Sequence, residues 1–136
     1  MAELTKPLPS PSPDSNPFWA AARQHRLLLQ HCGACAQFIF YPRHRCARCG
    51  GAALEWRPVS GTGTVYSFTV VRRTTNRPFA ADVPYVVAIV ALVEGPRMTT
   101  NIVGCSPDAV RCGMPVEVCF DDVTAEMTLV KFRPAA

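Results

Sequence analysis

The chain has 136 residues, of which 49% are hydrophobic, and a mean hydropathy of +0.10, which predicts a folded, soluble protein. The longest apolar run, Val86 to Val93, is only strand-sized and excludes a membrane-spanning helix. The formal net charge of +4 falls to about +2 if four thiolates (−4) bind one divalent metal (+2), so global charge gives little support to a nucleic-acid partner.

The first thirteen residues alternate proline with small residues. This pattern predicts an extended, solvated arm over residues 1–13. The arm lacks the charged region and apolar stretch of a secretory signal, so we expect a cytoplasmic protein in which thiols stay reduced.

A short helix is predicted after the arm. Asn16 is a candidate N-cap, and Pro17 suits the first helical position, so the helix should run to about Gln24. Phe18, Trp19 and Ala22 would share one face. We expect this face to pack against the same molecule rather than form a dimer surface. Residues 27–29 should then form a strand.

Two Cys-x-x-Cys pairs follow, and they predict a tetrahedral zinc site formed by Cys32, Cys35, Cys46 and Cys49. Disulfides are the alternative, but they require an oxidising compartment. Four protein ligands close the coordination shell, which predicts a structural rather than a catalytic metal. The metal would supply the stability that so short a segment cannot obtain from its own core.

The residues around the cysteines fit such a site. Gly33, Gly50 and Gly51 are expected to turn the backbone with positive φ, whereas Ala36 stands where a glycine is usual. Four basic residues lie between Cys35 and Cys49: Arg43, His44, Arg45 and Arg48. They either offset the charge of the zinc–thiolate centre or form a partner-binding patch.

From residue 61 onward the pattern changes to strands, predicted at residues 64–71, 85–93, 98–103, 116–120 and 128–132. Tyr66, Phe68 and Val70 should share one face of the first strand. A capped helical turn is predicted at residues 106–110, between the third and fourth strands. Five strands with a helix after the third predict an OB-fold barrel. The fold is therefore expected to be mainly β, with domains at 14–60 (helix and rubredoxin-like zinc ribbon) and 61–136 (OB-fold).

The chain resembles the zinc-ribbon/OB-fold proteins once called the thirty-fifth family of unknown function. The resemblance rests on these motifs: Asn16-Pro17-Phe18-Trp19, Leu29-Gln30-His31-Cys32, Cys46-Ala47-Arg48-Cys49-Gly50, residues 59–69, residues 113–118 and Phe132-Arg133-Pro134. It implies an accessory subunit or bridge that works with thiolase-like or ketosynthase-like enzymes, and in some members with hot-dog hydratases. Their substrates are acyl-CoA or acyl-carrier thioesters, and the partner holds the reactive cysteine.

The sequence offers no catalytic residue of its own. Cys105, Cys112 and Cys119 lack a neighbouring histidine in the barrel half and are expected to be small buried side chains. Asp121 and Asp122 suggest a solvated turn. Gly61-x-Gly63 lacks the rest of a dinucleotide fingerprint and is expected to let the chain cross from ribbon to barrel.

Two binding hypotheses remain open. An OB-fold that grips single-stranded nucleic acid would use Tyr66 and Phe68 with the arginines that follow. Alternatively, one loop forms a lip that meets the phosphates and adenine of a CoA thioester shared with the partner, or meets the partner itself. The lip residues are Arg72, Arg73, Arg77 and Phe79.

Overall fold

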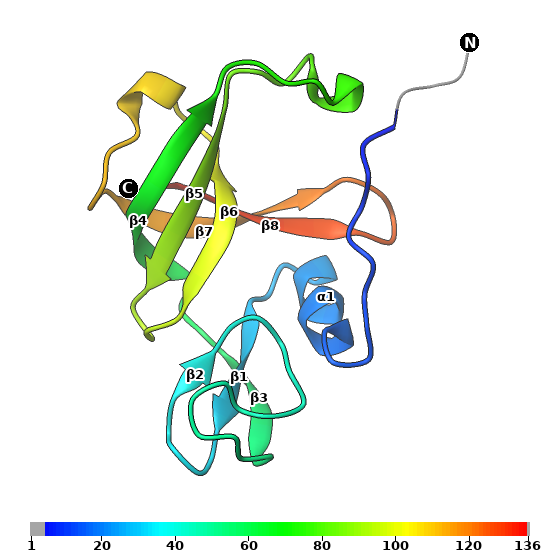
Figure 1. The fold of residues 1–136 in the computed structure, drawn as a ribbon, viewed down its shortest axis with the longest axis vertical. Coiled ribbons are helices and arrows are strands. Elements are labelled where there is room, and N and C mark those ends of the chain that lie inside the picture. Colours follow the sequence, from blue (N-terminus) through cyan, green and yellow to red (C-terminus); the bar gives the residue numbers. More distant parts are fainter. Residues whose placement is uncertain (1–4, 136) are drawn as a thin grey trace.

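The structure is a computed structural model that describes residues 5–135. A three-stranded ribbon sheet in the order β2-β1-β3 precedes a closed barrel in the order β4-β5-β6-β8-β7 (Figure 1). The ribbon elements are α1 (Asn16–Arg23), β1 (Leu28–Cys32), β2 (Phe38–Ile39) and β3 (Leu54–Pro58). The barrel elements are β4 (Thr62–Val71), η1 (Arg77–Phe79), β5 (Tyr85–Leu92), β6 (Arg97–Ile102), η2 (Pro107–Ala109), β7 (Pro115–Asp122) and β8 (Thr128–Pro134). The predicted mainly-β fold, a zinc ribbon followed by a five-stranded OB-fold, is confirmed.

Helix α1 begins one residue earlier than predicted, because Ser15 rather than Asn16 is its N-cap. Ser15 is fully buried, and its hydroxyl accepts a hydrogen bond of 2.8 Å from the Ser12 amide. Pro17 still lies in the first turn, where its missing amide costs nothing. The hydroxyl–amide turn at residues 12–15 therefore sets the start of the helix.

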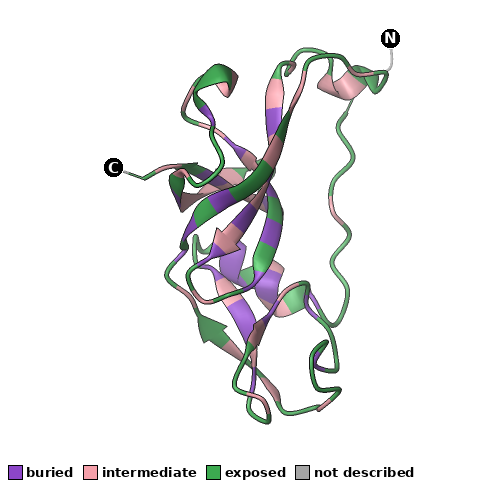
Figure 2. Ribbon diagram, turned by 60° about the vertical axis from the view of Figure 1, so that its left-hand side comes forward, coloured by how far each residue is buried: buried purple, intermediate pink, exposed green. Residues whose placement is uncertain are grey.

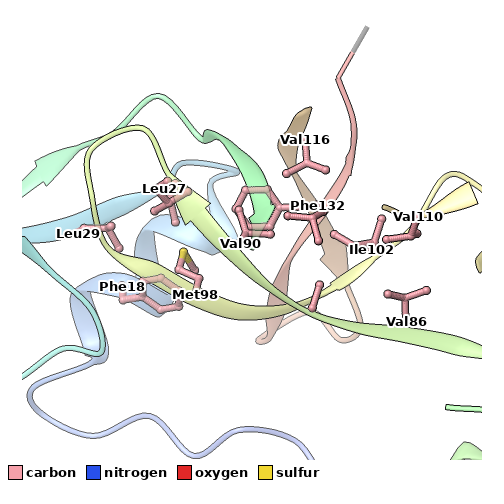
Figure 3. Packing of buried hydrophobic residues seen from close by; sticks show 13 residues of the cluster. Phe18, Leu27, Leu29, Val86, Val90, Met98, Ile102, Val110, Val116 and Phe132 are labelled. Atoms are coloured by element: carbon pink, nitrogen blue, oxygen red, sulfur yellow. The ribbon is translucent and has the colours of Figure 1, made fainter. Parts of the chain in front are cut away.

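The helix packs against the barrel with its apolar face. Phe18 is 3% exposed and lies in the same core cluster as Leu27, Leu29 and Met98 (Figure 3). Strands β6 and β8 close the barrel by pairing only at Ile102 and Phe132 among the described residues. The residues of β6 before Ile102 and of β8 before Phe132 are not paired with each other, which leaves an opening between them. Phe18 and its neighbours cover this opening, which joins ribbon and barrel in one core.

The first barrel strand differs from the predicted alternation because β4 carries a β-bulge. Val65 pairs with Val90 and Ser67 with Ile89, which leaves Tyr66 as the extra residue. Val65 is therefore buried, Phe68 and Val70 pack on the core, and Tyr66 is 51% exposed. The prediction that Tyr66 shares a face with Phe68 and Val70 is wrong, because one extra residue reverses the alternation.

The crossing from ribbon to barrel requires two glycines. Gly61 adopts φ +76°, and a Cβ there would lie 2.4 Å from the Val118 side chain. At Gly63 a Cβ would lie 2.4 Å from the carbonyl oxygen of Ala91. These close approaches hold β4 against β5 and β7 where the barrel closes, as the interpretation of Gly61-x-Gly63 as a crossing requires.

The proline-rich arm lies extended alongside the body. From residue 5 it has no regular secondary structure until α1, and its residues are mostly exposed (Figure 2). Lys6 forms an ion pair with Asp82 and lies 5.6 Å from the centre of the Phe79 ring. The arm thus reaches from the helix to the loop that carries η1. Residues 1–4 of the predicted arm lie outside the described residues.

Candidate metal centre and partner surfaces

The structure brings the four predicted ligand cysteines together. Their sulfur atoms all lie within 4.8 Å of one another, with Cys32–Cys49 at 3.6 Å and Cys35–Cys46 at 3.7 Å. Zinc–thiolate bonds of about 2.3 Å in a tetrahedron require sulfur atoms about 3.8 Å apart. The geometry and the soft donor set therefore fit one Zn²⁺ with a closed shell.

The two Cys-x-x-Cys pairs adopt the same type of backbone turn. The carbonyl of Cys32 accepts from the Ala36 amide at 2.8 Å, and that of Cys46 accepts from the Gly50 amide at 2.9 Å. Ala36 and Gly50 adopt φ of +60° and +76°. The expectation that Gly33 and Gly51 take positive φ is wrong, since the turn reverses only after the second cysteine of each pair, where Ala36 accepts the strain.

Backbone amides point at the thiols. The amides of Cys49 and Arg48 lower the pKa of Cys46 to about 6, and the amide of Arg48 lies 3.4 Å from its sulfur. The amide of Gly51 lies 3.4 Å from the Cys49 sulfur. Burial raises the pKa of Cys35 to about 12. A bound divalent metal removes such thiol protons outright, and the amide dipoles stabilise the resulting negative charge.

The four basic residues between Cys35 and Cys49 have separate roles. The backbone of Arg43 exchanges two hydrogen bonds of 2.7 and 2.8 Å with the buried Gln30 side chain. The Arg45 guanidinium donates to the Gly50 carbonyl at 3.1 Å, and His44 lies 3.8 Å from Asp14. Arg48 contributes its amide to Cys46, while its side chain lines a cleft next to the barrel.

The four residues of the predicted lip have different surroundings. Arg72 pairs with Asp108 at 3.2 Å, and Phe79 packs against Tyr85 with ring centres 6.3 Å apart. Phe79 lines a cavity of about 380 Å³ whose described lining includes none of the three arginines. Arg73 and Arg77 are exposed. Phe79 therefore lines this cavity, while Arg73 and Arg77 lie on the surface.

A larger hollow lies between α1 and the open edges of β6 and β8. It measures about 470 Å³ and is mainly apolar, with walls that include Trp19, Phe40, Met98 and Val130. It shares Asn101, Leu129 and Lys131 with the Phe79 cavity, so the two lie side by side along β6 and β8. Sequence reasoning missed it because its walls come from four separate segments. The only sequence signal was the apolar helix face that carries Trp19. In the structure the Trp19 indole nitrogen is buried without a hydrogen-bond partner among the described residues.

The spare cysteines are less buried than predicted. Cys112 is exposed, and Cys105 and Cys119 are half-buried. The prediction is wrong for Cys112, which lies in the loop after η2, and for Cys119, which lies on the outer face of β7. Cys105 does pack against the main core. Burial raises the pKa of Cys119, which keeps it a thiol.

Asp121 and Asp122 end strand β7 instead of forming the predicted solvated turn. Asp121 pairs with Lys131 at 2.7 Å, and Asp122 accepts from Thr128 at 2.6 Å and contacts His25 at 2.9 Å. His25 thus reaches the barrel although it precedes the ribbon. Asp122 and Cys119 are three residues apart on one strand and point to opposite faces, so His25 is not placed as a base for that thiol. Within residues 5–135 we find no cysteine–histidine catalytic pair.

Comparison with known proteins shows the family to which this architecture belongs. A model described as the ChsH2 rubredoxin-like zinc ribbon domain matches residues 19–55, and one described as the ChsH2 C-terminal OB-fold domain matches residues 56–121. A DUF35 domain-containing scaffold protein of Methanothermobacter thermautotrophicus is 37% identical over 105 residues, which cover 76% of this chain and 78% of that protein. The chain belongs to the DUF35 family. The resemblance stated from the sequence is thereby confirmed.

Two other relatives of this DUF35 chain carry names of acyl-CoA or aldolase enzymes. A probable enoyl-CoA hydratase alpha subunit of Thermomonospora curvata is 41% identical over 131 residues, 96% of this chain but 40% of that subunit. The DUF35 chain thus spans two fifths of the hydratase subunit. In the solved structure of an Ltp2-ChsH2(DUF35) aldolase, a chain 39% identical superposes with a TM-score of 0.84 over 95% of this chain and 100% of the matched one. Among the described residues of the DUF35 chain, none of the helices is long and apolar enough to cross a membrane.

Proposed function

We propose that this DUF35 chain is a non-catalytic accessory subunit of a thiolase-like or ketosynthase-like enzyme complex that acts on acyl-CoA. The partner would form or cleave a carbon–carbon bond next to the thioester carbonyl, or transfer the acyl group. The observation that carries the proposal is the likeness to a complete chain of the Ltp2-ChsH2(DUF35) aldolase at 39% identity. A hydratase is the other partner class, supported by the name of the Thermomonospora curvata relative; the family resemblance implies that it would have the hot-dog fold.

The metal in this proposal is structural. Four converging thiols supply every position of a tetrahedral zinc ion, which leaves none for water or substrate. Cys32 belongs to β1, the central strand of the ribbon sheet, and its neighbour Leu29 lies in the core shared with the barrel. Zinc binding would therefore fix the ribbon, and with it the position of α1 against the barrel.

Sharing of the substrate with the partner is the finer part of the proposal. Phe79 and Tyr85 line the cavity that continues into the apolar hollow beside Trp19. Arg73 and Arg77 remain exposed in the same loop, where guanidinium groups would meet the phosphates of CoA. The aromatic side chains would contact the adenine or the partner surface.

Single-stranded nucleic acid is the less favoured ligand. OB-folds that bind single strands present several stacking aromatics in a basic groove. Here Phe68 packs on the core, and Arg97 lies over the Tyr66 ring at 3.8 Å. On the outer face of the barrel, the β5 residues Ile89 and Ala91 lie between β4 and β6. Both are aliphatic and cannot stack on a base as an aromatic ring would. The two aromatics that suggested nucleic acid thus lie on opposite faces of the barrel wall.

The test is purification of the tagged chain at native abundance from its own cells, followed by mass identification of the proteins recovered in stoichiometric amount. We expect a thiolase-like enzyme whose activity falls when the DUF35 chain is deleted, and no turnover by the isolated chain. A stoichiometric hydratase would select the other partner class. Turnover of acyl-CoA by the isolated chain, or unchanged partner activity without it, would overturn the accessory role.

A further inference from the structure

A basic cleft separates the ribbon from the turn between β5 and β6. It measures about 410 Å³ and is lined by Phe38, Ile39, Phe40, Ala47, Arg48, Gly95, Pro96 and Arg97. Five of its eight lining residues come from the ribbon and three from the barrel. Two arginines line it, and no carboxylate is part of its described lining. The cleft is therefore positively charged on both sides.

Arg97 is held in place at the edge of this cleft. Its guanidinium lies 3.8 Å from the centre of the Tyr66 ring, a cation–π contact that reaches across β5. Ala91 pairs with Arg97 on one side and with Thr64 on the other, and its small side chain leaves room for the contact. The bulge at Tyr66 directs the ring outward, so the strand register orients the cation before any partner arrives.

Arg48 is fixed from the ribbon side. Its amide donates to the Cys46 sulfur, so the zinc knuckle sets its backbone. The charges of Arg43, Arg45 and Arg48 exceed the −2 of a zinc–tetrathiolate centre, which leaves the knuckle loops cationic. Glu94, the acidic residue next to the cleft turn, is occupied by the Ser60 amide at 2.8 Å. Neither cleft arginine has an ion-pair partner among the described residues.

Aromatic side chains adjoin the cleft: Phe40 lines it, Tyr66 contacts Arg97, and Tyr41 packs against Phe40 with ring centres 5.2 Å apart. Phe40 lines both this cleft and the apolar hollow beside α1. Tyr41 is 42% exposed and Tyr66 is 51% exposed. Arginine and tyrosine are the residue types that most often dominate protein–protein binding energy. The combination predicts a protein ligand more than a small anion.

The backbone amides around the cleft also favour a protein ligand over phosphate. Phosphate sites usually add several free amides to their cationic side chains. Here the Arg48 amide is committed to sulfur, and the Gly95 amide donates to the Leu92 carbonyl at 2.9 Å. The donors left for a ligand are the guanidinium groups of the two arginines, which bind side-chain carboxylates in bidentate geometry.

We propose that a junction surface, defined as Phe40, Tyr41, Arg48, Tyr66 and Arg97, docks an acidic segment of the partner protein across ribbon and barrel. The charge of the cleft and the aromatic rim select this occupant. The surface bridges both domains, so a partner bound there senses whether the zinc ribbon is correctly placed. The identity of the partner as an acyl-CoA enzyme rests on the proposed function, whereas the acidic character of its docking segment does not.

The first experiment uses the zinc-loaded chain alone. Backbone and arginine side-chain resonances are followed by NMR during titration with hexaglutamate and, separately, with inorganic pyrophosphate. We expect hexaglutamate to shift Arg48 and Arg97, with an affinity that weakens as NaCl is raised from 50 to 300 mM. The double variant Arg48→Glu/Arg97→Glu should bind at least about tenfold more weakly, a loss of about 1.4 kcal/mol. The matched control Arg26→Glu/Arg111→Glu makes the same charge change at exposed sites outside the cleft.

A second pair of variants distinguishes the effect of the Tyr66 ring on binding from an effect on folding. Tyr66→Phe keeps the ring beneath Arg97 and should bind like the native chain, whereas Tyr66→Ala should weaken binding several-fold. Zinc content and the denaturation midpoint are measured for each variant, and binding is compared only among zinc-loaded, folded chains. Loss of binding in Tyr66→Phe equal to that in Tyr66→Ala would remove the role given to the cation–π contact.

The second experiment uses the stoichiometric complex recovered from native cells. The Arg48→Glu/Arg97→Glu chain should recover at least about tenfold less of the same partner, while the control pair recovers a normal amount. Unchanged recovery, no shift with hexaglutamate, or tighter binding of pyrophosphate at the same residues would each overturn the acidic-segment proposal. If the partner is not an acyl-CoA enzyme, the proposed function fails, but the peptide titration still decides the docking surface.

Discussion

Ala36 and Gly50 occupy equivalent positions in the two cysteine knuckles, and both adopt left-handed backbone angles, with φ of +60° and +76°. Each donates its amide to the carbonyl of the first cysteine of its pair. Glycine takes this conformation without a steric penalty, whereas an alanine is strained there. The first knuckle therefore carries a local cost that the second does not.

Replacing Ala36 with glycine should stabilise the zinc-loaded protein. Relief of the left-handed strain is offset in part by the greater chain entropy of glycine, which leaves a gain of about 1 kcal/mol in the free energy of unfolding. Urea denaturation at fixed zinc concentration measures it. Ala34→Gly is the matched control, because Ala34 does not have positive φ, and it should lose stability. A destabilised Ala36→Gly chain would contradict the strain argument.

Removing one cysteine ligand should release the metal. Cys46→Ser should lose about one equivalent of zinc per chain and unfold the ribbon, because metal binding and folding of the ribbon are coupled. Partner recovery should weaken with it. Metal analysis and thermal denaturation report the change. Cys112→Ser is the control, since that thiol is exposed and outside the cluster. A metal-free Cys46→Ser chain with native stability and function would refute a structural zinc.

Trp19 offers a test of an unsatisfied donor. Its indole N–H is buried and has no acceptor among the described residues. Trp19→Phe removes that donor and keeps an aromatic ring, so the free energy of unfolding should change by no more than about 0.5 kcal/mol. Phe18→Ala is the contrast, because it empties a core position at a cost of about 3–5 kcal/mol. Equal losses in the two variants would show that Trp19 is held by more than packing.

Asp122 should contribute stability that depends on pH. Hydrogen bonds from Thr128 and then from His25 hold the pKa of its carboxyl below the ordinary value of 3.8. A lowered folded-state pKa means that the contribution is complete above pH 3.8 and is lost as the pH falls through the folded-state pKa. Asp122→Asn should therefore unfold at lower urea concentration at pH 7, and the gap to the native chain should close in acid.

The measured quantity is the difference in urea midpoint between the native chain and Asp122→Asn, because acid also releases zinc from both. Midpoints are taken at matched pH from neutral to strongly acidic conditions. A gap that stays constant below pH 3.8 would show that the carboxylate charge of Asp122 contributes nothing.

The sequence by itself determined which cysteines cluster and what the architecture is. Each Cys-x-x-Cys pair is ordered by a local turn, and the recurrence of the pair at short spacing predicted that Cys32, Cys35, Cys46 and Cys49 would converge. The five barrel strands were recognisable because side-chain alternation and the glycine-containing turns are also local patterns. Family motifs added the expected class of partner.

Tertiary structure alone decided what faces outward. The bulge at Tyr66 separates it from Phe68 and sets it beside Arg97, and His25 reaches Asp122 across 97 positions. Such contacts depend on strand register, which one inserted residue reverses, and no local pattern in the sequence reports where that residue lies. The predicted burial of Cys112 and Cys119 differed from the structure because loop side chains and the outward faces of strands are set by tertiary neighbours.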